Sequence, residues 1–388
     1  MKILLLTDSL PAVPRGGLDL HVQELRGELE RRGHQPVVAE LGGVEAPSRL
    51  PGGRLRASMG TNAVEERLEA ILRAERPDAV HIHNLQGVTA RAPELARASG
   101  AAVVWTHHDL FGVCPRVHLS DGDGADCDGP DGGRRCGPCH GGVQGLLATP
   151  AFVMRNRSFA EALRLTHQHV APSAWVATVL RSEGVAPDRI TVSAPAPPRA
   201  GGPAGLPPEG ERPRLVVAGD LREAKGADRV VDAFAAVADR ACLEVWGGPP
   251  AAPAPREGAF ERGLMERAGP GVSFHGRFQP HDLDSVLDGA AALVHCGRVR
   301  ETFGRTVNEA LQRGVPVVAV ASGGLAVQVV DGVNGFLVPP GDQEALEAAL
   351  RAVLDRGILL QADAAKWPRA DTLRDHVDAL EPLYEWRP

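Results

Sequence analysis

The chain has 388 residues, of which 43% are hydrophobic, and it carries a formal net charge of -7. This length is sufficient for two domains with substantial cores, and the apolar content excludes an intrinsically disordered chain. The mildly acidic charge balance gives no electrostatic reason to expect nucleic acid as a partner. No apolar run is long enough to span a membrane, and the apolar start Met1–Leu6 is too short for a signal peptide. We therefore predict a cytoplasmic protein; peripheral membrane contact and the oligomeric state stay open.

The first half of the chain alternates between short apolar runs and segments whose apolar residues have helical spacing. One such segment follows the pair Gly16-Gly17 and ends at Gly33, a residue type that commonly terminates helices. This β-α rhythm predicts a parallel sheet with helices on both faces. The predicted strands are Lys2–Thr7, Gln35–Glu40, Ala79–His83 and Ala102–Thr106, and the predicted helices are Leu18–Arg32, Thr61–Ala74 and Thr89–Ala98.

A similar rhythm restarts after residue 212. Between the halves, Pro195–Pro213 holds seven prolines and four glycines, a composition that predicts an interdomain linker. We predict a first domain of residues 1–198 together with 370–388, a linker over 199–212 and a second domain of 213–369. The elements predicted in this half are the strands Arg214–Ala218, Leu243–Trp246, Val272–Phe274, Ala292–His295 and Val315–Val320, and the helices Ala227–Ala238 and Asp371–Tyr384.

Two carboxylates eight residues apart, Glu301 and Glu309, flank the predicted start of a helix at Phe303-Gly304. Backbone N–H groups at a helix N-terminus, helped by the helix dipole, bind phosphate oxygens. A glutamate two turns further on is suited to accept hydrogen bonds from the two adjacent hydroxyls of a ribose. Glu301 precedes the phosphate site, where a sugar hydroxyl would lie. The segment therefore predicts a site for a sugar linked to a nucleotide.

This segment resembles the E-x7-E signature of the retaining GT-B glycosyltransferases of family 4. Further motifs of that family are matched in the correct order along nearly the whole chain. The resemblance implies an α/β fold of the GT-B type, in which two Rossmann-like domains face each other across a cleft. The matching motifs are the glycine-rich loop and helix from Gly16-Gly17 to His34, the T-x-H-D element Thr106-His107-His108-Asp109, the phosphate-binding region Gly219–Gly226, Ser322-Gly323-Gly324 and Asp331–Asp342.

The resemblance implies transfer of a sugar from a nucleotide diphosphate sugar, a UDP- or GDP-sugar, to an acceptor hydroxyl with retention of anomeric configuration. The expected acceptor is a small molecule, a lipid-linked group or a glycan, and no catalytic metal is expected. Lys225 should neutralise the leaving diphosphate, Glu301 should hold the donor sugar, and His108 should approach the reacting carbon. The donor-binding residues implied by the resemblance are Gly16, Gly17, Arg222, Lys225, Glu301, Thr302, Phe303, Gly304 and Glu309.

The chain departs from the family pattern at two places. Asp220 stands where the family usually has arginine, and we expect Arg222 to supply the missing charge. Val327, with Gln328 beside it, stands where a carboxylate often follows the Gly-Gly pair. Both departures concern the details of donor binding.

A polar segment that is rich in glycine and aspartate, the predicted insertion 112–142, contains four cysteines within 26 residues. Cys136-Gly-Pro-Cys139 has the spacing of a zinc knuckle. A thiolate-bound metal would order such a segment, with zinc as the first candidate and an iron–sulfur cluster as the second. Free thiols or a disulfide stay open as alternatives. The candidate ligands are Cys114, Cys127, Cys136 and Cys139, with His118 and His140 as substitutes.

Other functions also use α/β folds of this kind. The main alternative is a non-catalytic, sugar-nucleotide-binding subunit of a glycosylation complex, and Asp220 gives it some support. An NAD-dependent oxidoreductase lacks support, because no G-x-G-x-x-G follows the first strand. Non-hydrolysing sugar-nucleotide epimerases share the fold but lack this E-x7-E arrangement. His295, near a strand end, is expected to be structural.

Overall fold

The computed structural model describes residues 1–12, 14, 16–42, 59–121, 126–198, 202–248 and 258–386. Parts of the predicted linker (199–201) and of the predicted insertion (122–125) lie outside these ranges. The chain divides into two compact units, which are described separately. The first is Met1–Pro195 with Thr372–Pro388, and the second is Ala196–Asp371.

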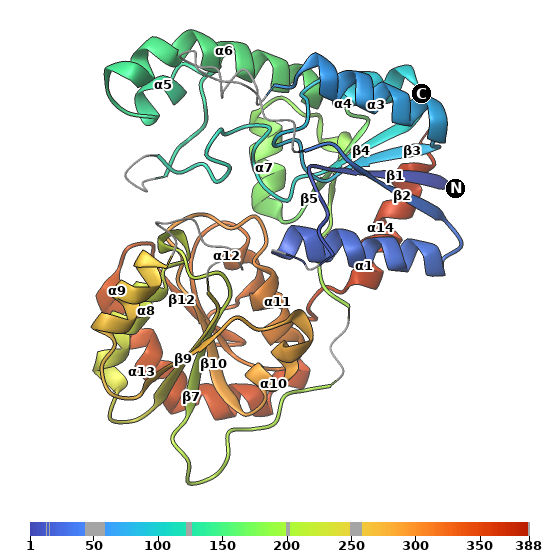
Figure 1. The fold of residues 1–388 in the computed structure, drawn as a ribbon. Helices are drawn as coiled ribbons and strands as arrows, with labels where there is room; N and C mark the ends of the chain where they lie inside the picture. The colour runs from blue at the N-terminus through green and yellow to red at the C-terminus, as the bar shows by residue number, and fades with distance from the viewer. Residues whose placement is uncertain are drawn as a thin grey trace. The chain divides into compact units, whose positions relative to one another are not determined.

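The first unit is built on a six-stranded parallel sheet in the order β2-β1-β3-β4-β5-β6 (Figure 1). Its strands are β1 Lys2–Thr7, β2 Gln35–Glu40, β3 Ala79–Ile82, β4 Ala102–Thr106, β5 Gln168–Ala171 and β6 Ile190–Val192. Its helices are α1 Gly17–Arg31, α3 Asn62–Glu75, α4 Ala92–Ala98, α5 Cys136–Cys139, α6 Gly142–Leu165, α7 Ala174–Ser182 and α14 Leu373–Tyr384. Helices α6 and α7 and strands β5 and β6 lie outside the predicted elements.

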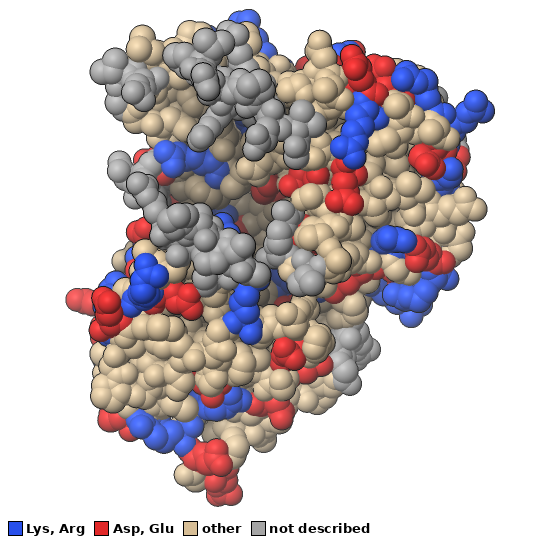
Figure 2. Space-filling view, viewed as in Figure 1, with Lys and Arg blue, Asp and Glu red and all other residues tan. Residues whose placement is uncertain are grey.

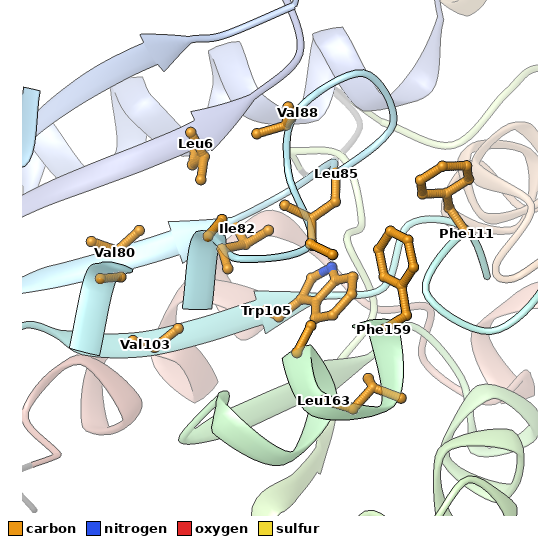
Figure 3. Packing of buried hydrophobic residues seen from close by; sticks show 14 of the residues in the cluster. Leu6, Val80, Ile82, Leu85, Val88, Val103, Trp105, Phe111, Phe159 and Leu163 are labelled. Atoms are coloured by element: carbon orange, nitrogen blue, oxygen red, sulfur yellow. The ribbon is translucent and has the colours of Figure 1, made fainter. Parts of the chain in front are cut away.

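The apolar strands of this sheet are buried on both faces, because successive side chains point to opposite sides. Leu4 and Leu6 of β1 belong to the core under α3, α4 and α6, of which Figure 3 shows the part around Trp105. Ile3 and Leu5 belong to the opposite core, under α1 and α14. The C-terminal helix α14 therefore completes the first unit, although more than 170 residues of the second unit precede it in the sequence.

The second unit has its own six-stranded parallel sheet, in the order β12-β11-β10-β7-β8-β9. Helices α8 and α13 cover one face, and α10, α11 and α12 cover the other. The strands are β7 Arg214–Ala218, β8 Cys242–Trp246, β9 Val272–Gly276, β10 Ala290–His295, β11 Val317–Val320 and β12 Gly335–Val338. The helices are α8 Ala227–Phe234, α9 Ala259–Arg267, α10 Leu283–Leu287, α11 Arg305–Gln312, α12 Leu325–Gln328 and α13 Gln343–Ala362.

Several predicted boundaries shift for local reasons. The helix predicted from Thr89 begins at Ala92, because the Thr89 hydroxyl accepts a hydrogen bond from the N–H of Arg91 and forms a turn first. The strand predicted from Val315 begins at Val317, after Pro316, which has no N–H to give to a sheet.

The charged side chains on the face drawn in Figure 2 are interspersed rather than gathered by sign. Many of the basic groups in the described part of the chain are paired with nearby carboxylates, as Arg91 is with Glu65 and Glu94. Among the described helices, none combines the length and apolarity that crossing a lipid bilayer requires.

Candidate active site

Lys225 lies in a tight turn between β7 and α8. It is the last residue of a 3-10 helix, Glu223–Lys225, and Gly226 follows it with a φ of 69°. A Cβ atom at Gly226 would lie 2.0 Å from the carbonyl oxygen of Cys296. Glycine is therefore required here both for the left-handed backbone and for the close approach of the loop after β10.

Arg298 connects the loop after β10 to the turn that carries Lys225. Its Nη1 donates to the carbonyl oxygen of Glu223 at 2.8 Å, and its two terminal nitrogens bind both carboxylate oxygens of Asp228 at 2.7 and 2.5 Å. A bidentate pair of this kind fixes geometry as well as contributing energy. The turn that carries Lys225 is thus held against the chain that leads to Glu301.

Glu301 and Lys225 form an ion pair, in which Lys225 Nζ donates to Glu301 Oε1. His295, the last residue of β10, also approaches this carboxylate, with Nε2 3.5 Å from Oε1. Burial alone would raise the pKa of Glu301, but the charge of Lys225 and the close approach of His295 hold it well below its usual range. The charge of Glu301 in turn raises the pKa of Lys225. Both groups are therefore ionised at neutral pH.

Helix α11 begins immediately after this carboxylate. Its N-cap is Gly304, with a φ of 88°, and a Cβ atom there would lie 2.3 Å from Leu325 Cδ2. The N-terminus of α11 thus directly follows Phe303-Gly304, as predicted from the sequence, and its backbone N–H groups and dipole favour an anion.

The pair Gly323-Gly324 packs against the loop that carries Glu301. Gly324 donates its N–H to the carbonyl oxygen of Glu301 at 2.7 Å, and a Cβ atom on Gly324 would lie 2.4 Å from the carbonyl oxygen of Thr302. Gln328 Nε2 donates to the carbonyl oxygen of Phe303. The residue beside the unusual Val327 therefore holds the loop that precedes α11 through a backbone carbonyl group.

Two predicted donor contacts already have protein partners. Glu309 Oε1 lies 3.0 Å from Nε of Arg305, and both side chains are largely buried. Arg222 Nε lies 2.7 Å from Asp220 Oδ2, in an exposed position. Asp220 thus engages the arginine that was expected to replace the usual one and partly offsets its charge.

In the first unit, His108 belongs to a cluster of histidines at the carboxyl ends of β3 and β4. His83 Nδ1 lies 3.0 Å from His108 Nε2. One nitrogen from each of His21, His83 and His108 lies within 4.8 Å of the others. Among the described residues, this is the group whose geometry would admit a metal ion.

The histidine cluster is anchored by α14 and is held neutral. His81 lies 2.8 Å from the hydroxyl of Tyr384 and 2.7 Å from Oγ1 of Thr106, and His376 lies 2.8 Å from Oγ of Ser193. Burial lowers the pKa of His108 and of His376 to about 3, and lowers the pKa of His81 well below its usual range. Neutral imidazoles can both donate and accept hydrogen bonds, as recognition of sugar hydroxyls requires.

Two other predicted elements of the first unit differ in how tightly they are packed. Asp109 Oδ1 accepts the N–H of Phe111 at 2.8 Å, and burial raises the pKa of Asp109 to about 6. Gly16 caps the N-terminus of α1, and a Cβ atom there would meet nothing within 4 Å. Space beside Gly16 is therefore open, whereas the T-x-H-D element is fixed.

The structure brings together Lys225, Glu301 and the start of α11 in the second unit, and it groups His108 with other histidines in the first. The contact of His295 with Glu301 and the places of His21 and His83 beside His108 were not predicted. The sequence did carry a signal for His83, because His81-Ile-His83 ends the strand adjacent to that of His108, and neighbouring parallel strands end at one edge.

Two family models match the chain. The model described as Glycosyltransferase Family 4 matches residues 15–195, and the model described as Glycosyl transferases group 1 matches residues 203–366. By sequence, the chain belongs to the family 4 glycosyltransferases. The two matches correspond closely to the parts of the two units that precede α14.

The chain is similar to known glycosyltransferases in sequence and to solved structures in fold. The chain is 34% identical over 184 residues to the D-inositol 3-phosphate glycosyltransferase of Geodermatophilus obscurus, which is 44% of this chain and 39% of that protein. It is similar in fold to HepE of Anabaena in complex with UDP, with a TM-score of 0.67 and 17% identity over 100% of both chains. It is also similar in fold to sucrose-phosphate synthase of Thermosynechococcus elongatus, with a TM-score of 0.63 and 19% identity over 99% of this chain and 95% of the other.

These likenesses confirm the GT-B fold, in which each unit is Rossmann-like. The match to the inositol phosphate glycosyltransferase spans less than half of either protein and leaves the acceptor open. The relatives by sequence include a glycosyltransferase and a trehalose synthase, which does not favour the non-catalytic alternative.

Proposed function

We propose that this glycosyltransferase moves a sugar from a nucleotide diphosphate sugar to an acceptor hydroxyl, with retention of anomeric configuration. The observation that carries this proposal is the pairing of Lys225 with Glu301 beside the N-terminus of α11. One ammonium, one carboxylate and one helix N-terminus in a single unit provide partners for the diphosphate and for sugar hydroxyls.

In the proposed reaction the bond between the anomeric carbon and the diphosphate oxygen breaks, and a bond to the acceptor oxygen forms on the same face. The proton of the acceptor hydroxyl passes to the departing phosphate oxygen, so no protein nucleophile is needed. Charge develops on the leaving diphosphate, where Lys225 and the N–H groups of α11 stabilise it. Glu301 binds the sugar and also keeps Lys225 protonated and oriented.

For the remaining site residues we propose supporting roles. Thr302, Phe303 and Gly304 present backbone to the phosphates, and Glu309 accepts hydrogen bonds from the ribose while Arg305 holds its carboxylate in place. The neutral His108 donates or accepts a hydrogen bond at the transferred sugar. In this scheme Arg222 has a smaller part than expected, because Asp220 partly offsets its charge.

We propose a UDP-sugar as the donor. The HepE structures similar in fold to this chain are described as complexes with UDP and with UDP-glucose, which supports uridine as the base. The acceptor is a hydroxyl of a small molecule, a lipid-linked group or a glycan, as the family resemblance implies.

The deciding experiment is a thermal-shift screen of the purified protein with UDP-, GDP-, ADP- and TDP-sugars, followed by measurement of nucleotide release on the hits. A ligand that binds the native state raises the melting temperature by mass action. We expect UDP-sugars to stabilise the protein and to release UDP slowly, and we expect release to accelerate with the correct acceptor.

Two outcomes would contradict the proposal. If none of the nucleotide sugars stabilised the protein over a wide concentration range, the assignment of a donor site would be wrong. Tight binding without release, across a broad set of acceptors, would instead favour a binding subunit.

A further inference from the structure

The four cysteines of the first unit, separated by up to 25 positions in the sequence, line one pocket. All four are free thiols, and Cys114 and Cys136 are buried. His140 also lines this pocket, whereas His118 is not among its lining residues. The four cysteines that line it are Cys114, Cys127, Cys136 and Cys139.

The backbone N–H groups of Arg116 and Leu119 form hydrogen bonds with the sulfur of Cys114. N–H groups that follow a cysteine in this way stabilise thiolates in metal knuckles. Cys136 and Cys139 stand one helical turn apart in α5. His140, the other candidate ligand, directs Nδ1 to the carbonyl oxygen of Cys136 at 2.9 Å. That bond leaves only Nε2 of His140 for a metal, and the four thiols by themselves complete a tetrahedral ligand set.

A buried cation, Arg155, lies beside these thiols. Arg155 of α6 is 1% exposed, and its guanidinium lies between the rings of Phe111 and Phe159, 4.5 and 4.4 Å from their centres. Figure 3 shows these two rings next to each other. Arg155 donates to the carbonyl oxygen of Phe111, and its Nε has no hydrogen-bond partner among the described residues.

Burying an arginine in this way is costly unless a negative charge compensates it. The groups within electrostatic range of Arg155 are Cys114, Cys136 and Asp109. Arg116, whose Nη2 donates to the carbonyl oxygen of Cys139 at 3.0 Å, adds a second cation at the pocket. Four thiolates around one divalent ion carry a net charge of about -2, which matches these two arginines.

The same segment is strained and tightly packed. Val117, Leu119 and Asp131 have positive φ angles of 67°, 52° and 47°, which are unfavourable for residues with a Cβ atom. Helix α5 also lies so close to α6 that a Cβ atom on Gly137 would be 2.1 Å from Thr149 Oγ1. Such backbone persists only where the surrounding structure strongly constrains it.

We infer that Cys114, Cys127, Cys136 and Cys139 bind one zinc ion as thiolates and that this ion fixes the segment that follows His108. In the described residues, no three of the sulfur atoms lie within 4.8 Å of one another. Tetrahedral zinc, with Zn–S bonds of about 2.3 Å, places its sulfurs about 3.8 Å apart. Rotation about χ1 moves a cysteine sulfur by up to about 3 Å, which is enough to close the site.

The site has a structural purpose in the fold. Leu110 donates its N–H to the carbonyl oxygen of Val117, and Cys127 donates to that of Leu119, so the cysteines are tied to the chain that leaves β4. A zinc ion would connect this loop to α5, and through Gly137 to α6. The expected consequence is a rigid support beside the T-x-H-D element.

The test is the metal content of the full-length protein after purification without chelators or affinity metals. We expect about one zinc ion per chain by mass spectrometry. We expect little or none in the double variant Cys136→Ser/Cys139→Ser. Cys242→Ser, which changes a partly buried cysteine of the second unit, is the matched control and should retain all of the zinc.

Because the double variant can fail to fold, the wild-type protein provides a second readout. After exchange into cobalt, it should show the visible bands of tetrahedral tetrathiolate cobalt, and a zinc chelator should lower its melting temperature. A protein without metal, or with iron and acid-labile sulfide in place of zinc, would overturn the inference. Neither measurement uses a sugar donor, so its outcome is independent of the proposed function.

Discussion

Lys225 and Glu301, which are 76 positions apart in the sequence, form an ion pair in the second unit. The turn that carries Lys225 follows β7, and the loop that carries Glu301 follows β10, which lies next to β7 in the sheet. The pairing therefore follows from strand order. A donor diphosphate would meet an ammonium whose charge and direction are already fixed, and such preorganisation is a major source of catalytic stabilisation.

Replacing Lys225 with alanine is expected to remove most of the stabilisation of the leaving diphosphate. We predict that kcat/KM for the donor falls by roughly 100- to 1,000-fold, or about 3–4 kcal/mol, while the fold is retained. The measurement is nucleotide release under steady-state conditions. Lys366→Ala, at an exposed lysine of the same unit that pairs with Asp363, is the control and should leave activity unchanged. Full activity in Lys225→Ala would refute the assigned donor site.

Glu301→Gln retains the size of the side chain but removes its charge. The folded-state pKa of Glu301 is lowered, so its contribution to stability is present above its unfolded value of 4.5 and is lost as pH falls further. The folded-state pKa of Lys225 is raised, so its contribution is present below 10.5 and is lost at higher pH.

The stability difference between wild type and Glu301→Gln should therefore be constant from about pH 5 to 9 and shrink in acid. Urea unfolding at several pH values measures it. Glu347→Gln, at a surface pair with Arg351, should change stability by less than about 0.5 kcal/mol at every pH. We also expect about a 100-fold loss of donor kcat/KM in Glu301→Gln. A stability difference that changes steadily between pH 5 and 9 would contradict the ion-pair assignment.

The buried histidines predict a loss of stability in weak acid. Burial lowers the pKa of His108 and His376 to about 3, so the unfolded chain takes up protons first as pH falls below about 6.5. Each such histidine reduces the free energy of unfolding by about 1.4 kcal/mol per pH unit between these limits. Above about pH 6.5 their full contribution to the free energy of unfolding is present.

The slope of this acid transition distinguishes buried from exposed histidines. In His376→Gln it should decrease by about 1.4 kcal/mol per pH unit, whatever the variant does to stability at neutral pH. In His281→Gln, at a histidine whose side chain is 80% exposed, it should stay as in the wild type. Equal slopes in all three proteins would show that His376 is not held neutral by burial.

Gly226 is predicted to be irreplaceable for structural reasons. Its φ of 69° disfavours any side chain, and a Cβ atom would lie 2.0 Å from the carbonyl oxygen of Cys296. Gly226→Ala should destabilise the protein by more than about 2 kcal/mol and displace Lys225. Gly263→Ala, in the middle of α9 with open space around it, should instead stabilise by about 0.5–1 kcal/mol. Thermal unfolding and donor affinity test both, and a tolerated alanine at 226 would contradict the packing described.

Much of the fold could be predicted from the sequence, because its strands are short apolar runs and several of its helices are strongly periodic. The strands Lys2–Thr7, Gln35–Glu40, Ala102–Thr106 and Arg214–Ala218 have the predicted bounds. The stretch from α6 to β6 was missed. Helix α6 is 24 residues long, contains Pro150 and has apolar residues on several sides, so its periodicity is weak.

The candidate site was predicted in parts. Glu301, Gly304 and Lys225 were identified through motif resemblance, and their order along the chain predicted a donor site. Their mutual contact depends on β10 lying beside β7, which no local pattern specifies. The histidines near His108 come from α1, from β3 and the residue after it, and from α14, and only His83 had a recognisable signal in the sequence.

The sequence by itself determined the two α/β units and the chemical types at their strand ends, because hydrophobic periodicity and glycine positions are local properties. Tertiary structure alone decided which of those groups meet. It paired Lys225 with Glu301, placed His295 beside them, brought α14 back to the first unit and gathered four cysteines at one pocket. These contacts join distant segments, and their geometry is set by strand order and by the packing of helices onto the sheets.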